Sequence, residues 1–488
     1  MVFSSLIFLF AFLPCVLFFY FVPFKNSRIW KNFVLLASSL VFYAWGEPLF
    51  VCVMVFSILL NYCLGLLINL CNQKDKKAAK VILVLAVIWN VGLLFVFKYL
   101  SFIADTINQA ISRPVLPGFE IALPIGISFF TFQILSYIID VYKQKVNVQK
   151  NVFSLALYVS LFPQLIAGPI VRYQTIEDQI QNRKETMAGF AAGFERFAIG
   201  LAKKCLLANY MAIIADTMFE MNNADLTLLA AWLGAIAYTL QIYLDFSGYS
   251  DMAIGLGLIF GFKFEENFNY PYAARSITDF WRRWHISLSS WFRDYVYIPL
   301  GGNRCSPARC SFNLFVVWLL TGIWHGANFT FWCWGLFYFV LLQFERSTAW
   351  AKRAENAKGI KLIFMRILCL IFVVCGWVLF RSSTLGQAKD YLLCMFGAAK
   401  IDVPQVTFLL TNVWFVLLVS VLVCVPFKTM LPFLFTSDEE KIARMPKIAV
   451  FCRNVFAVIR PIFIFCIFVI SLLNCIQATY NPFIYFNF

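Results

Sequence analysis

Histidine is nearly absent from this chain: His285 and His325 are the only two in 488 residues. They lie 40 residues apart, and the 15 cysteines include no CxxC pair, so the usual ligand sets of a zinc or di-iron site are missing. We therefore expect no bound metal. Cysteines such as Cys52 and Cys369 stand singly in apolar runs, where they are expected to pack as small hydrophobic side chains.

Charged residues are also scarce. They make up 13% of the chain, against 61% hydrophobic and 18% aromatic residues, and the mean hydropathy is +0.78. This composition excludes a water-soluble domain and predicts a polytopic membrane protein. The formal charge of +15 fits membrane topology and contact with anionic membrane lipids. No sequence motif for RNA or DNA binding is present, so we expect no nucleic-acid partner.

Long apolar runs recur along the whole chain and no linker interrupts them. Each is long enough to cross a hydrocarbon core of about 30 Å. Counted together they predict an all-α bundle of about 11–12 transmembrane helices in a single domain, residues 1–488. The predicted spans are Phe3–Phe24, Trp30–Phe50, Phe50–Leu70, Val81–Ile103, Ile121–Val141, Phe190–Met218, Leu226–Asp245, Cys310–Phe344 as two, Leu362–Phe380, Val406–Phe427 and Ile459–Ile476.

The orientation in the membrane follows from the short basic loops, which tend to remain cytoplasmic. Lys25, Arg28 and Lys31 follow the first apolar run, so we expect the N-terminus outside. The basic segments Lys74–Lys80 and Arg275–Arg309 are then also inside, which is consistent with the number of spans between them. We expect a multi-pass protein of the cytoplasmic (plasma) membrane.

The segment Cys310–Phe344 has 35 residues and no formal charge. As one helix it would measure about 50 Å, too long for one crossing, so it must turn or break. Gly322, Gly326 and Asn328 surround His325 and are suited to such a break. His325 is then about 22 Å along the helix from Cys310, near the bilayer centre. A polar residue at that depth indicates a functional site, while the alternative is a neutral histidine bonded across helices.

The segment Phe280–Tyr297 has helical spacing of its aromatic residues. We expect one helix at the cytoplasmic interface, with Trp281 and Trp284 on the face that also points His285 inward. Its arginines either anchor the helix to lipid or receive the phosphates of an anionic cytosolic donor. The candidate donor-binding arginines are Arg282, Arg283, Arg293 and Arg304.

Two further polar segments stand in apolar surroundings. Gln241–Gly255 places Asp245, Ser247 and Tyr249 at the inner end of a span, and Phe162–Tyr173 interrupts a helix with proline and glycine around Gln164. Irregular backbone at membrane depth requires a protein-lined or water-filled cavity. We expect these side chains, with Asn328, to line a funnel open to the cytoplasm; the alternative is polar helix ends packed into loops.

Several of these motifs resemble, in the same order, those of the membrane-bound O-acyltransferases, and most closely the bacterial branch that O-acetylates alginate and other polysaccharides. The resemblance is carried by the following segments: Pro124–Tyr142, Phe162–Tyr173, Gln241–Gly255, Phe268–Tyr272, Phe280–Arg304 and Gly322–Gly335. It implies an hourglass-shaped bundle of about eleven helices with re-entrant and interfacial pieces. It also implies N-terminal helices over about 1–120, a catalytic core over about 121–345 and C-terminal helices over about 346–488.

By the same resemblance, His325 is the essential catalytic histidine and His285 the second family histidine. No bound cofactor is implied. Acetyl-coenzyme A is the expected donor, a polysaccharide the final acceptor, and an extracytoplasmic SGNH-type acetyltransferase the partner. Two alternatives stay open: D-alanyl transfer to a teichoic-acid-type polymer, and a secondary transporter, for which midplane polar groups and broken helices would also serve.

Overall fold

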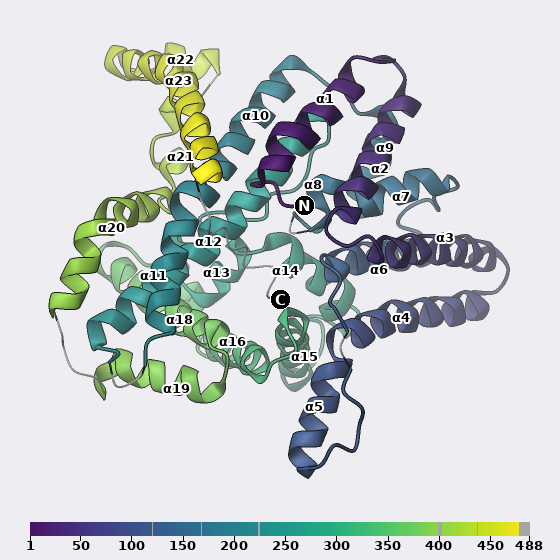
Figure 1. The fold of residues 1–488 in the computed structure, drawn as a ribbon, viewed down its shortest axis with the longest axis horizontal. Helices are drawn as coiled ribbons and strands as arrows, with labels where there is room; N and C mark the ends of the chain where they lie inside the picture. Colours follow the sequence, from purple (N-terminus) through teal and green to yellow (C-terminus); the bar gives the residue numbers. More distant parts are fainter. Residues whose placement is uncertain (120, 167, 223–224, 399–402, 437, 478–488) are drawn as a thin grey trace.

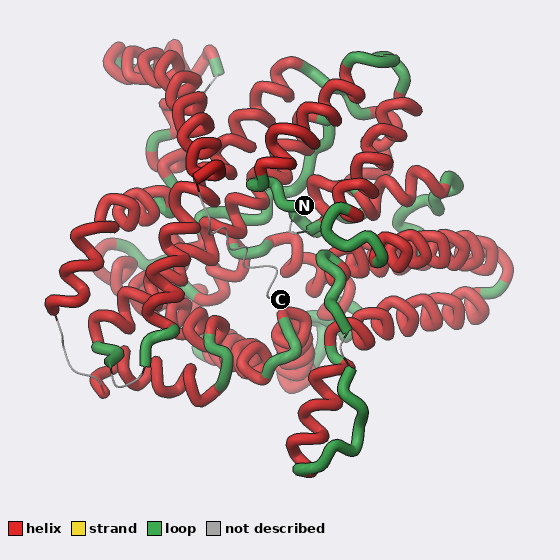
Figure 2. The backbone as a smooth tube through the Cα atoms, in the orientation of Figure 1, coloured by secondary structure: helices red, strands yellow, loops and turns green. Residues whose placement is uncertain are grey.

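The computed structural model describes residues 1–488 except 120, 167, 223–224, 399–402, 437 and 478–488. Within the described residues the regular structure is helical and contains no strand (Figure 2). The first helices are α1 (Leu13–Phe21), α2 (Arg28–Ala44), α3 (Phe50–Lys74), α4 (Lys76–Lys98) and α5 (Leu100–Ile111). The last are α17 (Trp350–Glu355), α18 (Gly359–Arg381), α19 (Leu385–Leu393), α20 (Val403–Val423), α21 (Phe427–Met430), α22 (Glu439–Ala443) and α23 (Lys447–Gln477).

The central helices build the candidate site. They are α6 (Ile127–Tyr142), α7 (Val152–Ser160), α8 (Phe162–Leu165), α9 (Tyr173–Asn182), α10 (Met187–Ala202), α11 (Asn209–Phe219), α12 (Leu228–Ile259), α13 (Ile277–Arg283), α14 (Ile286–Phe292), α15 (Pro307–His325) and α16 (Phe329–Ser347). Figure 1 shows α13 and α14 in the middle of the molecule, with α15 and α16 beside them. Short π-helical segments join α10 to α11 and follow α14.

Helices α10 and α12 pack with their backbones in contact. A β-carbon added at Gly193 would lie 2.5 Å from the carbonyl oxygen of Gly255, and one at Gly200 would lie 2.5 Å from that of Gly248. No larger residue fits at such a separation. Small residues that allow close backbone approach are a usual device of helix packing in membranes, where burial of apolar surface from water gives little help.

Helices α3 and α4 form an antiparallel pair that extends to one side of the bundle (Figure 1). Asp75 ends α3 and begins α4, because its carboxylate accepts the Lys77 backbone N–H at 2.8 Å. Asn61 and Asn90 are buried between the two helices, and Asn90 Nδ2 donates to Asn61 Oδ1 at 2.8 Å. The two asparagine side chains therefore satisfy each other between the helices, as an apolar environment requires.

The prediction of an all-α polytopic membrane bundle is confirmed. Among the described residues, six helical stretches are long and apolar enough to cross a membrane: Phe50–Lys74, Lys76–Lys98, Met187–Phe219, Leu228–Ile259, Gly359–Arg381 and Lys447–Gln477. Shorter apolar helices occur at Phe8–Phe21, Ile127–Tyr142 and Val413–Val423. The predicted break of Cys310–Phe344 is also confirmed, since α15 ends at His325 and α16 begins at Phe329.

Two local predictions were wrong. The segment Phe280–Tyr297 is not one interfacial helix, because α13 ends at Arg283 and α14 begins only at Ile286, after a turn at His285. Helix α14 then continues directly into the π-helical turn Arg293–Tyr297. Its tryptophans do not face lipid headgroups but are buried in the protein against neighbouring aromatic rings. The span beginning near Leu226 does not end at Asp245, since α12 continues to Ile259. In both cases tertiary packing outweighed the local pattern.

Candidate active site

His325 stands at the last position of α15, immediately before the break. Ser306 caps the start of this helix and Pro307 occupies its first turn, both favourable at a helix N-terminus. Asn328 then caps α16 by accepting the backbone N–H of Thr330 at 3.0 Å. His325 is 7% exposed, and its imidazole packs against the rings of Trp334 and Phe380, with centroids 5.0 Å away in each case.

The turn that carries His325 is fixed by close contact between α15 and α16. A β-carbon at Gly322 would lie 2.5 Å from the carbonyl oxygen of Phe331, and one at Gly335 would lie 2.4 Å from that of Trp318. At Gly326 the same atom would lie 2.4 Å from the Phe331 ring. The glycines around His325 are thus required by space, and their close packing holds the histidine in place.

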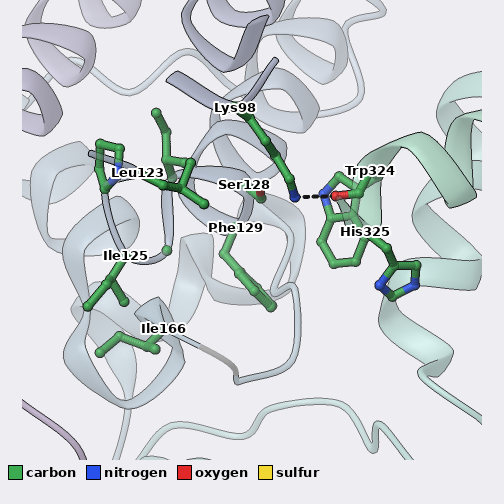
Figure 3. A pocket seen from close by; sticks show the side chains of 11 residues that line it. Lys98, Leu123, Ile125, Ser128, Phe129, Ile166, Trp324 and His325 are labelled. Carbon is green, nitrogen blue, oxygen red and sulfur yellow. Dashed lines mark hydrogen bonds between the residues drawn. The ribbon is translucent and has the colours of Figure 1, made fainter. Parts of the chain in front are cut away.

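Two side chains from another part of the chain donate hydrogen bonds to the last backbone carbonyls of α15. The ammonium group of Lys98 donates to the Trp324 carbonyl oxygen (Figure 3), and the Tyr99 hydroxyl donates to the Ile323 carbonyl oxygen at 2.6 Å. The last carbonyls of a helix lack partners within the helix and carry partial negative charge, so a cation stabilises them. Lys98 and Tyr99 were missed in the sequence, although a lysine ending an apolar run of this length was an available signal.

His285 occupies the sharp turn between α13 and α14, with a left-handed backbone (φ 43°, ψ 56°). Its ring is buried, with Nδ1 3.0 Å from Asn267 Oδ1. The same oxygen accepts the Ser287 hydroxyl at 2.9 Å and the Ser287 backbone N–H at 3.3 Å. Asn267 was also missed in the sequence, although it directly precedes the aromatic motif Phe268–Tyr272.

The two histidines line one cavity of about 420 Å³. The ring of Trp324 is near both histidines, with its centroid 4.9 Å from that of His325 and 6.1 Å from that of His285. Trp281, Trp284, Arg282 and Arg293 line the same cavity. His325 and Trp324 also line a second cavity of about 60 Å³, together with Lys98 and residues 123–129 (Figure 3). His325 therefore separates two cavities.

The four candidate arginines are placed differently. Arg282 and Arg293 lie on the larger cavity with side chains 65% and 61% exposed, and they pair with Glu355 at 3.0 Å and Asp294 at 2.7 Å. Arg283 pairs with Asp279 within α13 at 2.8 Å. Arg304 is exposed, and neither it nor Arg283 is among the residues that line this cavity.

The carboxylate of Asp294 connects Arg293, on the cavity, to Arg172 in another part of the chain. It receives Arg293 at 2.7 Å and Arg172 at 2.6 Å. Burial alone would raise the pKa of Asp294, but these hydrogen bonds outweigh burial and lower it below the ordinary value. Arg293 is thereby held beside the cavity with its own charge partly compensated.

The remaining predicted residues lie around the site without lining the larger cavity. Gln164 is fully buried in α8 and donates to the Tyr158 carbonyl at 2.6 Å. Asp245 forms a buried ion pair with Lys204 at 2.9 Å, and Tyr249 stacks on Phe3 with centroids 4.4 Å apart. Ser247 lines a separate cavity with Asn267. Asn328 caps α16 and donates to the Ser383 carbonyl at 2.9 Å.

A helical membrane fold with two histidines on one cavity is the architecture of a polytopic membrane enzyme. Residues 41–380 match the family model "MBOAT, membrane-bound O-acyltransferase family". The chain therefore belongs to this family and is an O-acyltransferase, as the motifs predicted.

Known proteins similar to this chain point to one branch of the family. The chain is 44% identical to the probable alginate O-acetylase AlgI of Pseudomonas aeruginosa, over 81% of this chain and 75% of that protein. It is 37% identical to the peptidoglycan O-acetyltransferase of Helicobacter pylori, over 81% of this chain and 80% of that protein. It is 28% identical to the teichoic acid D-alanyltransferase of Bacillus subtilis, over 61% and 77% respectively. The predicted resemblance to the polysaccharide O-acetylation branch is confirmed.

Proposed function

We propose that this protein takes an acetyl group from acetyl-coenzyme A in the cytosol and passes it across the cytoplasmic membrane for O-acetylation of an exported or cell-envelope polysaccharide. The observation that carries the proposal is the single cavity that joins both histidines to Arg282 and Arg293. Guanidinium groups pair with phosphates in bidentate geometry, so this opening suits the phosphorylated end of coenzyme A. The higher identity to the two O-acetylating relatives supports acetyl over D-alanyl.

The arrangement also supports transfer from one side to the other. Helix α15 begins beside the basic segment predicted to be cytoplasmic and rises about 28 Å over its 19 residues to His325. Helix α4 begins at Lys76, also predicted inside, and ends at Lys98. The smaller cavity between Lys98 and His325 is then on the outer side of the histidine, where the acceptor would arrive.

In the proposed reaction, His325 removes the proton of an acceptor hydroxyl, and the hydroxyl oxygen attacks the carbonyl carbon of the thioester. The new C–O ester bond forms as the C–S bond breaks. The departing coenzyme A thiolate takes back one proton from the histidines, so the site ends in its starting state. The acceptor hydroxyl is supplied by an extracytoplasmic SGNH-type acetyltransferase, which then esterifies the polysaccharide. In this proposed orientation the N-terminus of the chain is also on the outer side of the membrane.

The proposal is tested with His325→Ala produced at wild-type abundance. Ester-linked acetate on the exported glycan should be lost, because general acid–base contributions are worth about 10²–10⁴-fold in rate. In vesicles, the wild type should transfer labelled acetyl from acetyl-coenzyme A, and the variant should not. Unchanged acetate in the variant, labelled alanine in place of acetate, or movement of an intact solute would each contradict the proposal.

A further inference from the structure

Asn267 joins three segments that are distant in sequence. Its side-chain oxygen contacts His285 and Ser287, and the Ser287 hydroxyl in turn accepts the backbone N–H of Ile170 at 3.0 Å. Ile170 belongs to the irregular segment after α8, and Asn267 to the loop before α13. Asn267, His285 and Ser287 are all buried, with 0–2% of their surface exposed. Buried polar groups in such a network are held in defined positions.

The polarity of these hydrogen bonds fixes the proton on His285. A backbone N–H can only donate, so the Asn267 atom that faces Ser287 N at 3.3 Å is the amide oxygen. The Ser287 hydroxyl receives the Ile170 N–H, and its own hydrogen goes to the nearer acceptor, the Asn267 oxygen at 2.9 Å, since His285 Nδ1 is 3.5 Å away. An amide oxygen carries no hydrogen. The bond of 3.0 Å to His285 Nδ1 must then be donated by the imidazole.

We propose that Asn267 and Ser287 are positioning residues that hold His285 as the Nδ1–H tautomer, so that its Nε2 lone pair is available to take up a proton in the active-site cavity. No hydrogen-bond partner of Nε2 is found among the described residues, and His285 lines the cavity that it shares with His325. The tautomer follows from the hydrogen bonds alone. Its use in catalysis rests on the proposed acyl transfer.

This tautomer gives the two histidines different tasks. His325 takes the proton of the acceptor hydroxyl, and a proton must then reach the coenzyme A sulfur in the larger cavity. His285, which lines that cavity, accepts at Nε2 the proton of the His325 imidazolium through water and donates it to the thiolate. One proton leaves the hydroxyl and one arrives at sulfur, so the transfer is balanced. The opposite tautomer, with hydrogen on Nε2, could not accept it.

The scarcity of histidine makes a direct test possible. In His325→Gln, purified through a tag without histidine, His285 is the only histidine, so ¹⁵N-histidine labelling reports one imidazole. Nitrogen NMR of this variant in lipid should show a protonated Nδ1 and a bare, imine-type Nε2. Adding Asn267→Leu should give a mixture of tautomers. A protonated Nε2 in the single variant, or the same spectrum in both, would overturn the inference.

Kinetics test the use of the tautomer in acyl transfer. Asn267→Leu should lower kcat roughly 10²-fold with little change in KM for the donor, as expected when a proton-transfer group is lost. Asn267→Asp keeps the accepting oxygen and should restore much of kcat. Its carboxylate favours the charged imidazole and raises the pKa of His285, so the acid limb of the kcat profile should shift upward by about one pH unit or more.

Asn90→Leu is the matched control, because Asn90 is equally buried and hydrogen-bonded but lies between α3 and α4. It should keep the wild-type profile at equal abundance. An Asn267→Asp profile that coincides with the wild type, or an Asn267→Leu enzyme with wild-type kcat, would overturn the positioning role. A wild-type protein that transfers no acetyl would refute the proposed function instead, and the NMR result would still decide the tautomer.

Discussion

At this site, residues of the same type differ in their role because their surroundings differ. His285 and His325 are both buried and line one cavity, yet His325 ends a helix next to a second cavity while His285 is turned out of the helix and bonded to Asn267. The arginines divide in the same way. Arg282 and Arg293 lie on the cavity, and Arg283 is held by Asp279 in its own helix.

Replacing the cavity arginines tests the donor site. Arg282→Ala and Arg293→Ala should each raise KM for acetyl-coenzyme A roughly 3–10-fold with a smaller effect on kcat, because exposed charge-assisted contacts bind the donor without taking part in the chemical step. Initial rates over a range of donor concentrations measure the change.

Two further variants sharpen this test. Arg304 was a donor-binding candidate in the sequence, but it is exposed and does not line the cavity. Arg304→Ala should therefore leave KM for acetyl-coenzyme A unchanged. Arg353→Ala, an exposed arginine of α17, is the matched control for loss of surface charge. An equal rise in KM for all four variants would contradict a specific donor site at Arg282 and Arg293.

At the scale of elements, close backbone approach decides where the functional groups stand. Helices α15 and α16 touch at Gly322 and Gly335, and α10 and α12 touch at two further glycine pairs. These contacts leave no room for side chains, so the helices cannot slide without separating. The position of His325 at the end of α15 follows from that contact and from the cap supplied by Lys98 and Tyr99.

The close approach is tested with Gly322→Ala. The new methyl group would meet the Phe331 backbone oxygen at 2.5 Å, which cannot move independently. Overpacking of this kind costs about 1–3 kcal/mol. We expect a lower thermal transition in detergent and reduced acetyl transfer. Gly92→Ala in α4 is the control, since no atom lies within 4 Å of its added methyl group; equal behaviour of the two variants would contradict the packing argument.

At the scale of the whole molecule, the N-terminal helices are tied to the core by a charged cluster around Glu185, which itself lies outside the predicted spans. Glu185, just before α10, accepts hydrogen bonds from Tyr20 of α1 at 2.5 Å, Arg28 of α2 at 2.6 Å and Lys31 of α2 at 3.1 Å. Burial alone would raise the pKa of Glu185, but these donors outweigh it and lower the pKa to about 2.

This cluster predicts an acid-sensitive contact. Because the folded-state pKa of Glu185 is depressed, its stabilisation is present above the unfolded pKa of about 4.3 and is lost as pH falls toward about 2. Glu185→Gln should lower stability at pH 7 by an amount on the order of 2 kcal/mol and flatten the acid dependence in that window. Thermal unfolding between pH 2.5 and 7 measures both. Parallel curves for variant and wild type would contradict the assignment.

Much of the functional framework was present in local sequence. The break at Gly326, the polytopic helical class and the family membership were predicted correctly, because composition, helix-breaking residues and contiguous motifs are properties of short segments. The helical spacing of Phe280–Tyr297 was misleading. Its aromatic residues pack against α15, α16 and α18, and this packing favours a turn at His285 that no periodicity in the segment signals.

The sequence by itself determined that this is a polytopic membrane protein, that it transfers acyl groups and that its two histidines lie in the characteristic motifs of the family. Only the tertiary structure decided which polar groups meet there. Lys98 reaches the carbonyl next to His325 across 226 residues of sequence, and Asn267 reaches His285 across 18. Such pairings depend on how helices pack, and close backbone contacts at glycines fix that packing, so spacing along the chain could not specify them.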